Sequence, residues 1–209
     1  MEFFQSGILM VVLGVAGILL VAAGYRSPEF FHSLQSVLPI VLISIALAVI
    51  LFAFSFRRSA LKAWQYLMTG HIYIMAAVVF NADHINLIEL VYYISGVLVA
   101  FLLGYYCLQR IRAIDNDISL NRFHGYVYEQ ETTGFLFLLS AMGMLGFPIT
   151  AAFVGIDVLF TYVHSGQTAL IILLALCFIF IELAAFRILL RIFLGPHKKL
   201  DHPVAFRSS

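Results

Sequence analysis

Residues 134–163 read GFLFLLSAMGMLGFPITAAFVGIDVLFTYV, an apolar segment whose one charged side chain is Asp157. As one straight α-helix these residues would extend about 45 Å, whereas the hydrocarbon core of a bilayer is about 30 Å thick. The middle of the segment contains Gly143, Gly146 and Pro148. Proline lacks an N–H, and its ring clashes with the carbonyl four residues earlier. The segment therefore predicts a transmembrane helix that is broken at Gly146–Pro148.

The composition places the rest of the chain in a membrane as well. Of the 209 residues, 63% are hydrophobic and 11% are charged, whereas soluble domains contain about 25% charged residues. These values exclude a soluble domain, a disordered chain and a small disulfide scaffold. We expect an all-α integral membrane protein that forms a single transmembrane domain over residues 1–209. Its six spans are expected at residues 7–24, 36–56, 62–80, 85–109, 134–163 and 168–194, with a polar connector over 110–133.

The basic residues predict the orientation of the chain. With six spans both termini lie on one side of the membrane, and eleven of the 12 Lys and Arg residues fall on that side. Lys and Arg are enriched in the cytoplasmic loops of membrane proteins. We therefore expect both termini to be cytoplasmic, in the inner (cell) membrane. The eleven residues are Arg57, Arg58, Lys62, Arg110, Arg112, Arg122, Arg187, Arg191, Lys198, Lys199 and Arg207, and Arg26 lies on the opposite side.

Three ionisable side chains of the expected spans are candidates for a path through the membrane: Glu182 in the last span, His71 in the third and Asp157 in the broken helix. A charge at the bilayer centre costs at least about 2.5–3.5 kcal/mol, so such residues are candidates for function. We interpret them as a proton or ion path, since a buried carboxyl holds a proton more readily and histidine exchanges one near neutral pH. The alternatives are a neutral Glu182 that bonds a neighbouring helix or a partner subunit, a packed His71, and an Asp157 that faces a polar crevice.

Two motifs resemble a known family of membrane subunits. Residues 140–153, SAMGMLGFPITAAF, follow the shape of the signature LSLAGIPPTAGF, which that family carries on a broken helix. Tyr66 and His71 keep the spacing of the family segment AYSSISH. The family is that of the antiporter-like membrane subunits, which includes proton-translocating subunits of respiratory complex I, Mrp antiporters, membrane hydrogenases and inorganic-carbon uptake complexes. The resemblance covers about residues 55–195 and concerns only the C-terminal half of the family.

The resemblance implies a half-length relative that works as a subunit of a multi-subunit, proton- or cation-translocating complex. Such a subunit would contribute a broken helix and protonatable residues beside a longer antiporter-like chain. The lysine that family members carry on this helix is replaced by Ile156, and the first half of the family has no counterpart. These differences leave a second interpretation open, a non-conducting scaffold that anchors a partner subunit. A stand-alone homodimeric transporter is a third interpretation, although no internal repeat is visible.

The connector is the candidate docking surface for a cytoplasmic subunit, through Arg110, Arg112, Arg122 and His124. The alternative is an amphipathic segment that lies in the membrane interface. Both cysteines fall within apolar runs, and we find no pattern of metal ligands, nucleophiles or phosphate-binding glycines. We therefore expect no catalytic site, metal or cofactor in this chain. The expected partners are other membrane subunits and lipid, and no nucleic acid.

Overall fold

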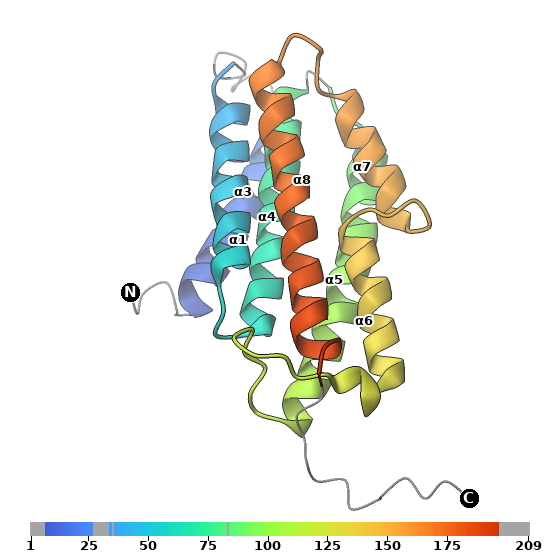
Figure 1. The fold of residues 1–209 in the computed structure, drawn as a ribbon. Coiled ribbons are helices and arrows are strands. Elements are labelled where there is room, and N and C mark those ends of the chain that lie inside the picture. The colour runs from blue at the N-terminus through green and yellow to red at the C-terminus, as the bar shows by residue number, and fades with distance from the viewer. Residues whose placement is uncertain (1–6, 27–33, 35, 83, 197–209) are drawn as a thin grey trace, which may run out of the picture.

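The computed structural model describes residues 7–26, 34, 36–82 and 84–196, and all regular secondary structure in them is helical. The expected all-α fold is confirmed for this part of the chain (Figure 1). Five of the helices are long and apolar enough to cross a membrane, so the chain is a multi-pass membrane protein. The elements are α1 (Gly7–Arg26), α3 (Leu38–Ser55), α4 (Ala60–Asn81), α5 (Leu87–Ile114), η3 (Tyr126–Tyr128), α6 (Glu131–Met144), α7 (Ala151–Thr161), α8 (Thr168–Ile188) and η4 (Leu189–Phe193).

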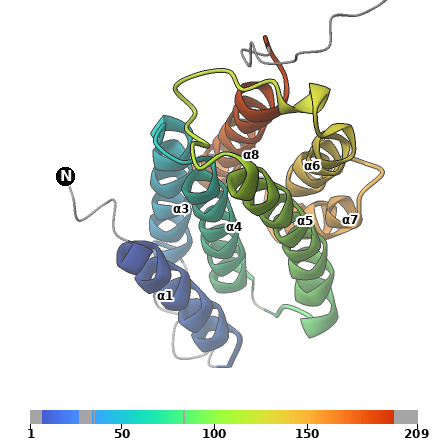
Figure 2. The same ribbon diagram turned by 90° about the horizontal axis from the view of Figure 1, so that it is seen from below.

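Helix α4 is the centre of the bundle. It packs against α3, α5, α8 and α1, and 89% of its membrane-spanning stretch is buried, compared with 11% for α1 at the edge (Figure 2). Lipid contact requires an apolar surface, whereas a helix surrounded by protein can carry polar side chains that find partners there. This position accounts for the presence of Thr69, His71 and Asn81 on a transmembrane helix, all three of them buried.

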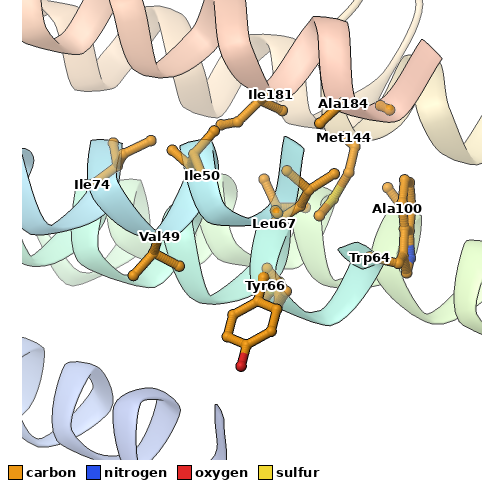
Figure 3. Packing of buried hydrophobic residues seen from close by; sticks show 14 of the residues in the cluster. Val49, Ile50, Trp64, Tyr66, Leu67, Ile74, Ala100, Met144, Ile181 and Ala184 are labelled. Atoms are coloured by element: carbon orange, nitrogen blue, oxygen red, sulfur yellow. The ribbon is translucent and has the colours of Figure 1, made fainter. Parts of the chain in front are cut away.

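The interior is filled by large apolar side chains that come from several helices. Ile50 of α3, Leu67 of α4, Met144 of α6 and Ile181 of α8 belong to one buried cluster, part of which is drawn in Figure 3. Trp64 is also fully buried, and its indole N–H donates to the Phe101 carbonyl of α5 at 3.0 Å. The cluster therefore joins both sides of the bundle around α4.

Small residues bring the broken helix against α5. The Ser140 hydroxyl of α6 donates to the Ala100 carbonyl of α5 at 2.8 Å, which pairs a polar group within the membrane. On α7, a Cβ added to Gly155 would lie 2.3 Å from the Cα of Tyr93. The two backbones therefore touch, and only glycine permits this approach. Both halves of the broken helix are held by the same neighbour, α5.

The segment predicted to be a broken helix consists of two helices, and the expected break at Gly146–Pro148 falls between them. Helix α6 ends at Met144 because Gly146 adopts a positive φ of 65°. The Phe147 N–H then donates to the Met142 carbonyl at 3.0 Å, and the Gly146 N–H donates to the Gly143 carbonyl at 3.2 Å. These two bonds form a Schellman motif, a common way to end a helix, and a proline often follows it.

The connector is shorter than the expected range of 110–133. Helix α5 continues to Ile114, since the residues after 109 are good helix formers, and α6 begins at Glu131. Residues 115–130 remain between the two helices, at the end of the bundle where α4 begins and α8 ends (Figure 1). The Ala60 N–H of α4 donates to the Ile118 carbonyl, which ties the connector to the bundle.

Candidate functional site

His71 lies in the middle of α4 with no solvent-exposed surface. Its Nδ1 is 2.8 Å from the hydroxyl of Tyr93, a residue of α5 that is also fully buried. The ring of Phe178, from α8, packs edge-on against the imidazole at a centroid distance of 6.2 Å. Three helices thus enclose a single protonatable side chain, with one of its nitrogens in a hydrogen bond.

The break in the broken helix lies close to His71. No hydrogen bond of normal geometry reaches Nε2 within the described residues, but the ring interacts with the main-chain carbonyl of Met144. In an uninterrupted helix this carbonyl would accept the N–H of residue 148, and that residue is a proline. Because α6 ends at Met144 and Pro148 has no N–H to offer, the Met144 carbonyl has no helical donor. It lies beside the one buried histidine of the described transmembrane helices.

The arrangement consists of the His71 imidazole, the Tyr93 hydroxyl and the Met144 carbonyl, and these groups limit where protons can lie. A tyrosine hydroxyl can donate to Nδ1, which leaves the proton of neutral imidazole on Nε2. A second proton would make both nitrogens donors, and Tyr93 would then have to accept from Nδ1 instead. Protonation of both nitrogens would therefore require the Tyr93 hydroxyl to reorient.

A cavity of about 260 Å³ lies between α5 and the broken helix. Its lining includes Ala100 from α5, Ser140 and Gly143 from α6, and Thr150 at the start of α7. The Thr150 hydroxyl donates to the Phe147 carbonyl at 2.7 Å, so a side chain of the turn between α6 and α7 provides a hydrogen bond to one of the turn's own backbone carbonyls. Gly143 directly precedes Met144 in the chain, and the cavity thus reaches the last turn of α6.

The structure does not bring the other two predicted path residues to His71. Glu182 and Asp157 are both exposed on the surface of this chain. Neither makes a hydrogen bond or ion pair with another residue that the structure describes. Glu182 instead shares a surface of α8 with Ile172, Ala175 and Ile179, which are also exposed.

The predicted docking residues divide into two groups. Arg110, Arg112 and Arg122 are exposed, and Arg122 forms an ion pair with Asp117 at 2.9 Å. His124 is 7% exposed, so it is not available as a surface contact. Its Nε2 lies 2.9 Å from the Ser119 carbonyl, and its ring stacks on Tyr126. The His124 N–H also donates to the Arg191 carbonyl of η4 at 2.9 Å, which ties the connector to the end of the last helix.

The charges of the connector are held by local contacts. The Ser119 N–H and the nearby guanidinium of Arg122 hold the pKa of the Asp117 carboxyl below its usual range. Burial, together with the hydrogen bond that Tyr126 donates to Asp115, raises the pKa of the Tyr126 phenol. Asp117 is therefore ionised and Tyr126 is neutral near pH 7.

Sequence reasoning missed two members of the site, Tyr93 and the Met144 carbonyl. Tyr92 and Tyr93 are adjacent on an apolar helix, and the pattern did not show which one faces inward; Tyr92 is 53% exposed and Tyr93 is buried. The carbonyl could have been found, since Pro148 identifies the residue four positions earlier as lacking a donor. No family model matches this chain, and no curated protein matches it significantly.

Proposed function

We propose that this chain is a membrane subunit of a multi-subunit complex that translocates protons or cations, and that His71 is its internal proton site. The observation that carries this proposal is the position of His71, between the hydroxyl of Tyr93 and the Met144 carbonyl that Pro148 frees. Non-helical backbone at membrane depth is tolerated where it is buried in protein or lines a water-filled path. In transporters, the free carbonyls of broken helices lie at ion sites.

The surface of α8 supports membership in a complex. Glu182 lies near the middle of the span Thr168–Phe193 and is exposed. Facing lipid, its charge would cost at least about 2.5–3.5 kcal/mol. A neighbouring transmembrane subunit that carries a hydrogen-bond donor would remove this cost. The proposed neighbour is a longer antiporter-like chain, as the resemblance of residues 140–153 implies, and Asp157 would face it or a second subunit.

The proposed topology has six crossings, with α6 and α7 together forming the fifth. Both termini are placed on the cytoplasmic side of the inner membrane, because Lys and Arg are enriched in cytoplasmic loops. This placement is supported by the exposed arginines that gather where α4 begins and α5 ends, among them Arg57, Arg58, Arg110 and Arg112.

A non-conducting scaffold is the second candidate, and a specific observation favours it. Glu182 and Asp157 face outward, so they do not continue a path from His71 within this chain. The position of the family lysine is taken by Ile156, whose side chain packs against Gly146 at the break. In this case the exposed Arg110, Arg112 and Arg122 would anchor a partner, and His71 would serve only in helix packing.

The experiment that separates the two candidates begins with purification from the native host in mild detergent. Mass spectrometry then identifies the co-purifying chains, and the complex is reconstituted in vesicles that contain a pH-sensitive dye. His71→Gln retains a hydrogen-bonding side chain but does not titrate, and the exposed His84→Gln is the matched control. Positioned proton-transfer groups contribute about a hundredfold or more to rate, so transport should fall by about that factor in His71→Gln alone.

Two results would contradict the proposal. If an intact complex containing His71→Gln transports as fast as the His84→Gln complex, His71 carries no proton and the scaffold is the better assignment. If the chain is recovered alone, without a second membrane subunit, its role in a multi-subunit complex is wrong.

A further inference from the structure

A polar cavity lies between the first turn of α4 and the last turns of α5, away from His71. Its volume is about 370 Å³. Three basic side chains contribute to its lining, Arg58, Lys62 and Arg112, while Asp117 is the one carboxylate among the described lining residues. The negative charge of Asp117 is compensated by its ion pair with Arg122, at 2.9 Å. The cavity therefore has an excess of positive charge.

Unlike Asp117, the two arginines that line the cavity have no ion-pair partner among the described residues. Neither Arg58 nor Arg112 forms an ion pair with another described residue, and both are exposed. They come from different parts of the chain, since Arg58 lies in the turn between α3 and α4 and Arg112 lies in the last turn of α5. Guanidinium groups present several N–H donors in a planar fork that matches the oxygens of a phosphate.

Neutral donors line the same space. The Gln109 amide donates to the Tyr105 hydroxyl at 2.8 Å, and both residues line the cavity. Because the Tyr105 oxygen accepts this bond, its own O–H remains able to donate to a third group. The first turn of α4 also forms part of the lining, through Leu61 and Lys62, and helix N-termini favour anions.

The depth of the cavity corresponds to the level of lipid headgroups. Helix α5 has 28 residues, or about 42 Å, so its end extends past a hydrocarbon core of about 30 Å. Gln109 and Arg112 lie in that end, where a lipid phosphate is within reach of a side chain. Basic pockets between transmembrane helices on the cytoplasmic side bind the headgroups of anionic lipids.

We propose that this cavity is a binding site for a phosphate-bearing anion, held by Arg58 and Arg112 together with Tyr105 and Gln109. The chemistry is that of a phosphodiester or phosphate group, which either an anionic lipid or a soluble phosphate could supply. The site is independent of His71 and of any transport that the chain performs.

The test compares two charge-matched double variants of the purified full chain. Arg58→Gln with Arg112→Gln removes the cavity arginines. Arg57→Gln with Arg110→Gln removes the same charge from the neighbouring exposed arginines, which do not line the cavity. Each protein in detergent is titrated with short-chain phosphatidylglycerol, with phosphatidylcholine or with inorganic phosphate, and native mass spectrometry and the unfolding midpoint report binding.

The wild type and the Arg57/Arg110 variant should bind phosphatidylglycerol, and the Arg58/Arg112 variant should bind it about thirtyfold more weakly, since each basic side chain near an anionic lipid contributes about fivefold. Binding of phosphatidylglycerol but not inorganic phosphate identifies a lipid headgroup as the ligand. Equal competition by inorganic phosphate, with the same dependence on Arg58 and Arg112, identifies a soluble phosphate.

Equal losses in both double variants would show only general attraction between charges, and they would overturn the proposal. No preference of the wild type for phosphatidylglycerol or phosphate over phosphatidylcholine would overturn it as well. Should the double variant fail to fold, the single variants Arg58→Gln and Arg112→Gln are used, each expected to weaken binding about fivefold.

Discussion

Removal of a single hydroxyl, in Tyr93→Phe, tests the buried pair at the centre of the bundle. The substitution keeps the ring and its packing against His71, with centroids 6.0 Å apart. It removes the partner of Nδ1 at 2.8 Å, in a side chain whose Nε2 already lacks a well-formed hydrogen bond. Both nitrogens would then be without a good partner inside a fully buried site.

The expected loss of stability is about 1–2 kcal/mol. A buried polar group left without its partner costs about 1–3 kcal/mol. Hydrogen bonds between transmembrane helices average about 0.6 kcal/mol and reach about 1.7, because unfolded helices in a membrane also find partners. The enclosed position of His71 places Tyr93→Phe near the upper end of that range. For a chain of this size, such a loss corresponds to a fall in Tm of roughly 2–8 °C.

The assay is thermal unfolding of the purified protein in one detergent, with Tyr92→Phe as the control. Tyr92 precedes Tyr93 on the same helix and is 53% exposed, so its hydroxyl should be dispensable. A double variant, His71→Leu with Tyr93→Phe, should lose less than the sum of the two single variants, because neither polar group then remains unpaired. If Tyr93→Phe unfolds at the same temperature as Tyr92→Phe, the His71–Tyr93 bond does not stabilise the fold and our reasoning about this site is wrong.

Two further predictions concern the break and the connector. Gly146→Ala should cost about 1–2 kcal/mol of stability for its positive φ alone, and the contact of the new Cβ with Ile156 should add to this loss. The control Gly166→Ala should be neutral, because a Cβ there would meet no atom within 4 Å. Equal unfolding midpoints of the two variants would contradict this account of the break. Because folding lowers the pKa of Asp117, its ionised carboxylate stabilises the folded state. This stabilisation is complete above the pKa of the unfolded state, about 3.9, and is lost as the pH falls through the lower pKa of the folded state. The protection of the Ser119 amide, measured as its hydrogen-exchange rate relative to the intrinsic rate at the same pH, should therefore fall below about pH 4. The same pH-dependent loss of protection in Asp117→Asn would refute the assignment.

The sequence was informative where the physics is local. The length of an apolar run, and the missing N–H of Pro148 after Gly146, act over a few residues, and they predicted membrane helices and a break that the structure places between Met144 and Ala151. The boundaries of the connector were less well predicted. Residues 110–114 include two arginines, but nothing in them stops a helix, and α5 continues through them.

Only the tertiary structure decided which ionisable groups face inward. His71 meets Tyr93, 22 residues later in the chain, and the Met144 carbonyl, because α4, α5 and α6 pack with particular rotations about their axes. Glu182 faces outward because of the rotation of α8, and the high apolarity of its span did not indicate this. An apolar helix carries almost no sequence pattern that distinguishes its inner face from its lipid-facing one. The rotation of each helix is set by the packing of distant residues such as Gly155 against Tyr93, which appears only when the chain is folded.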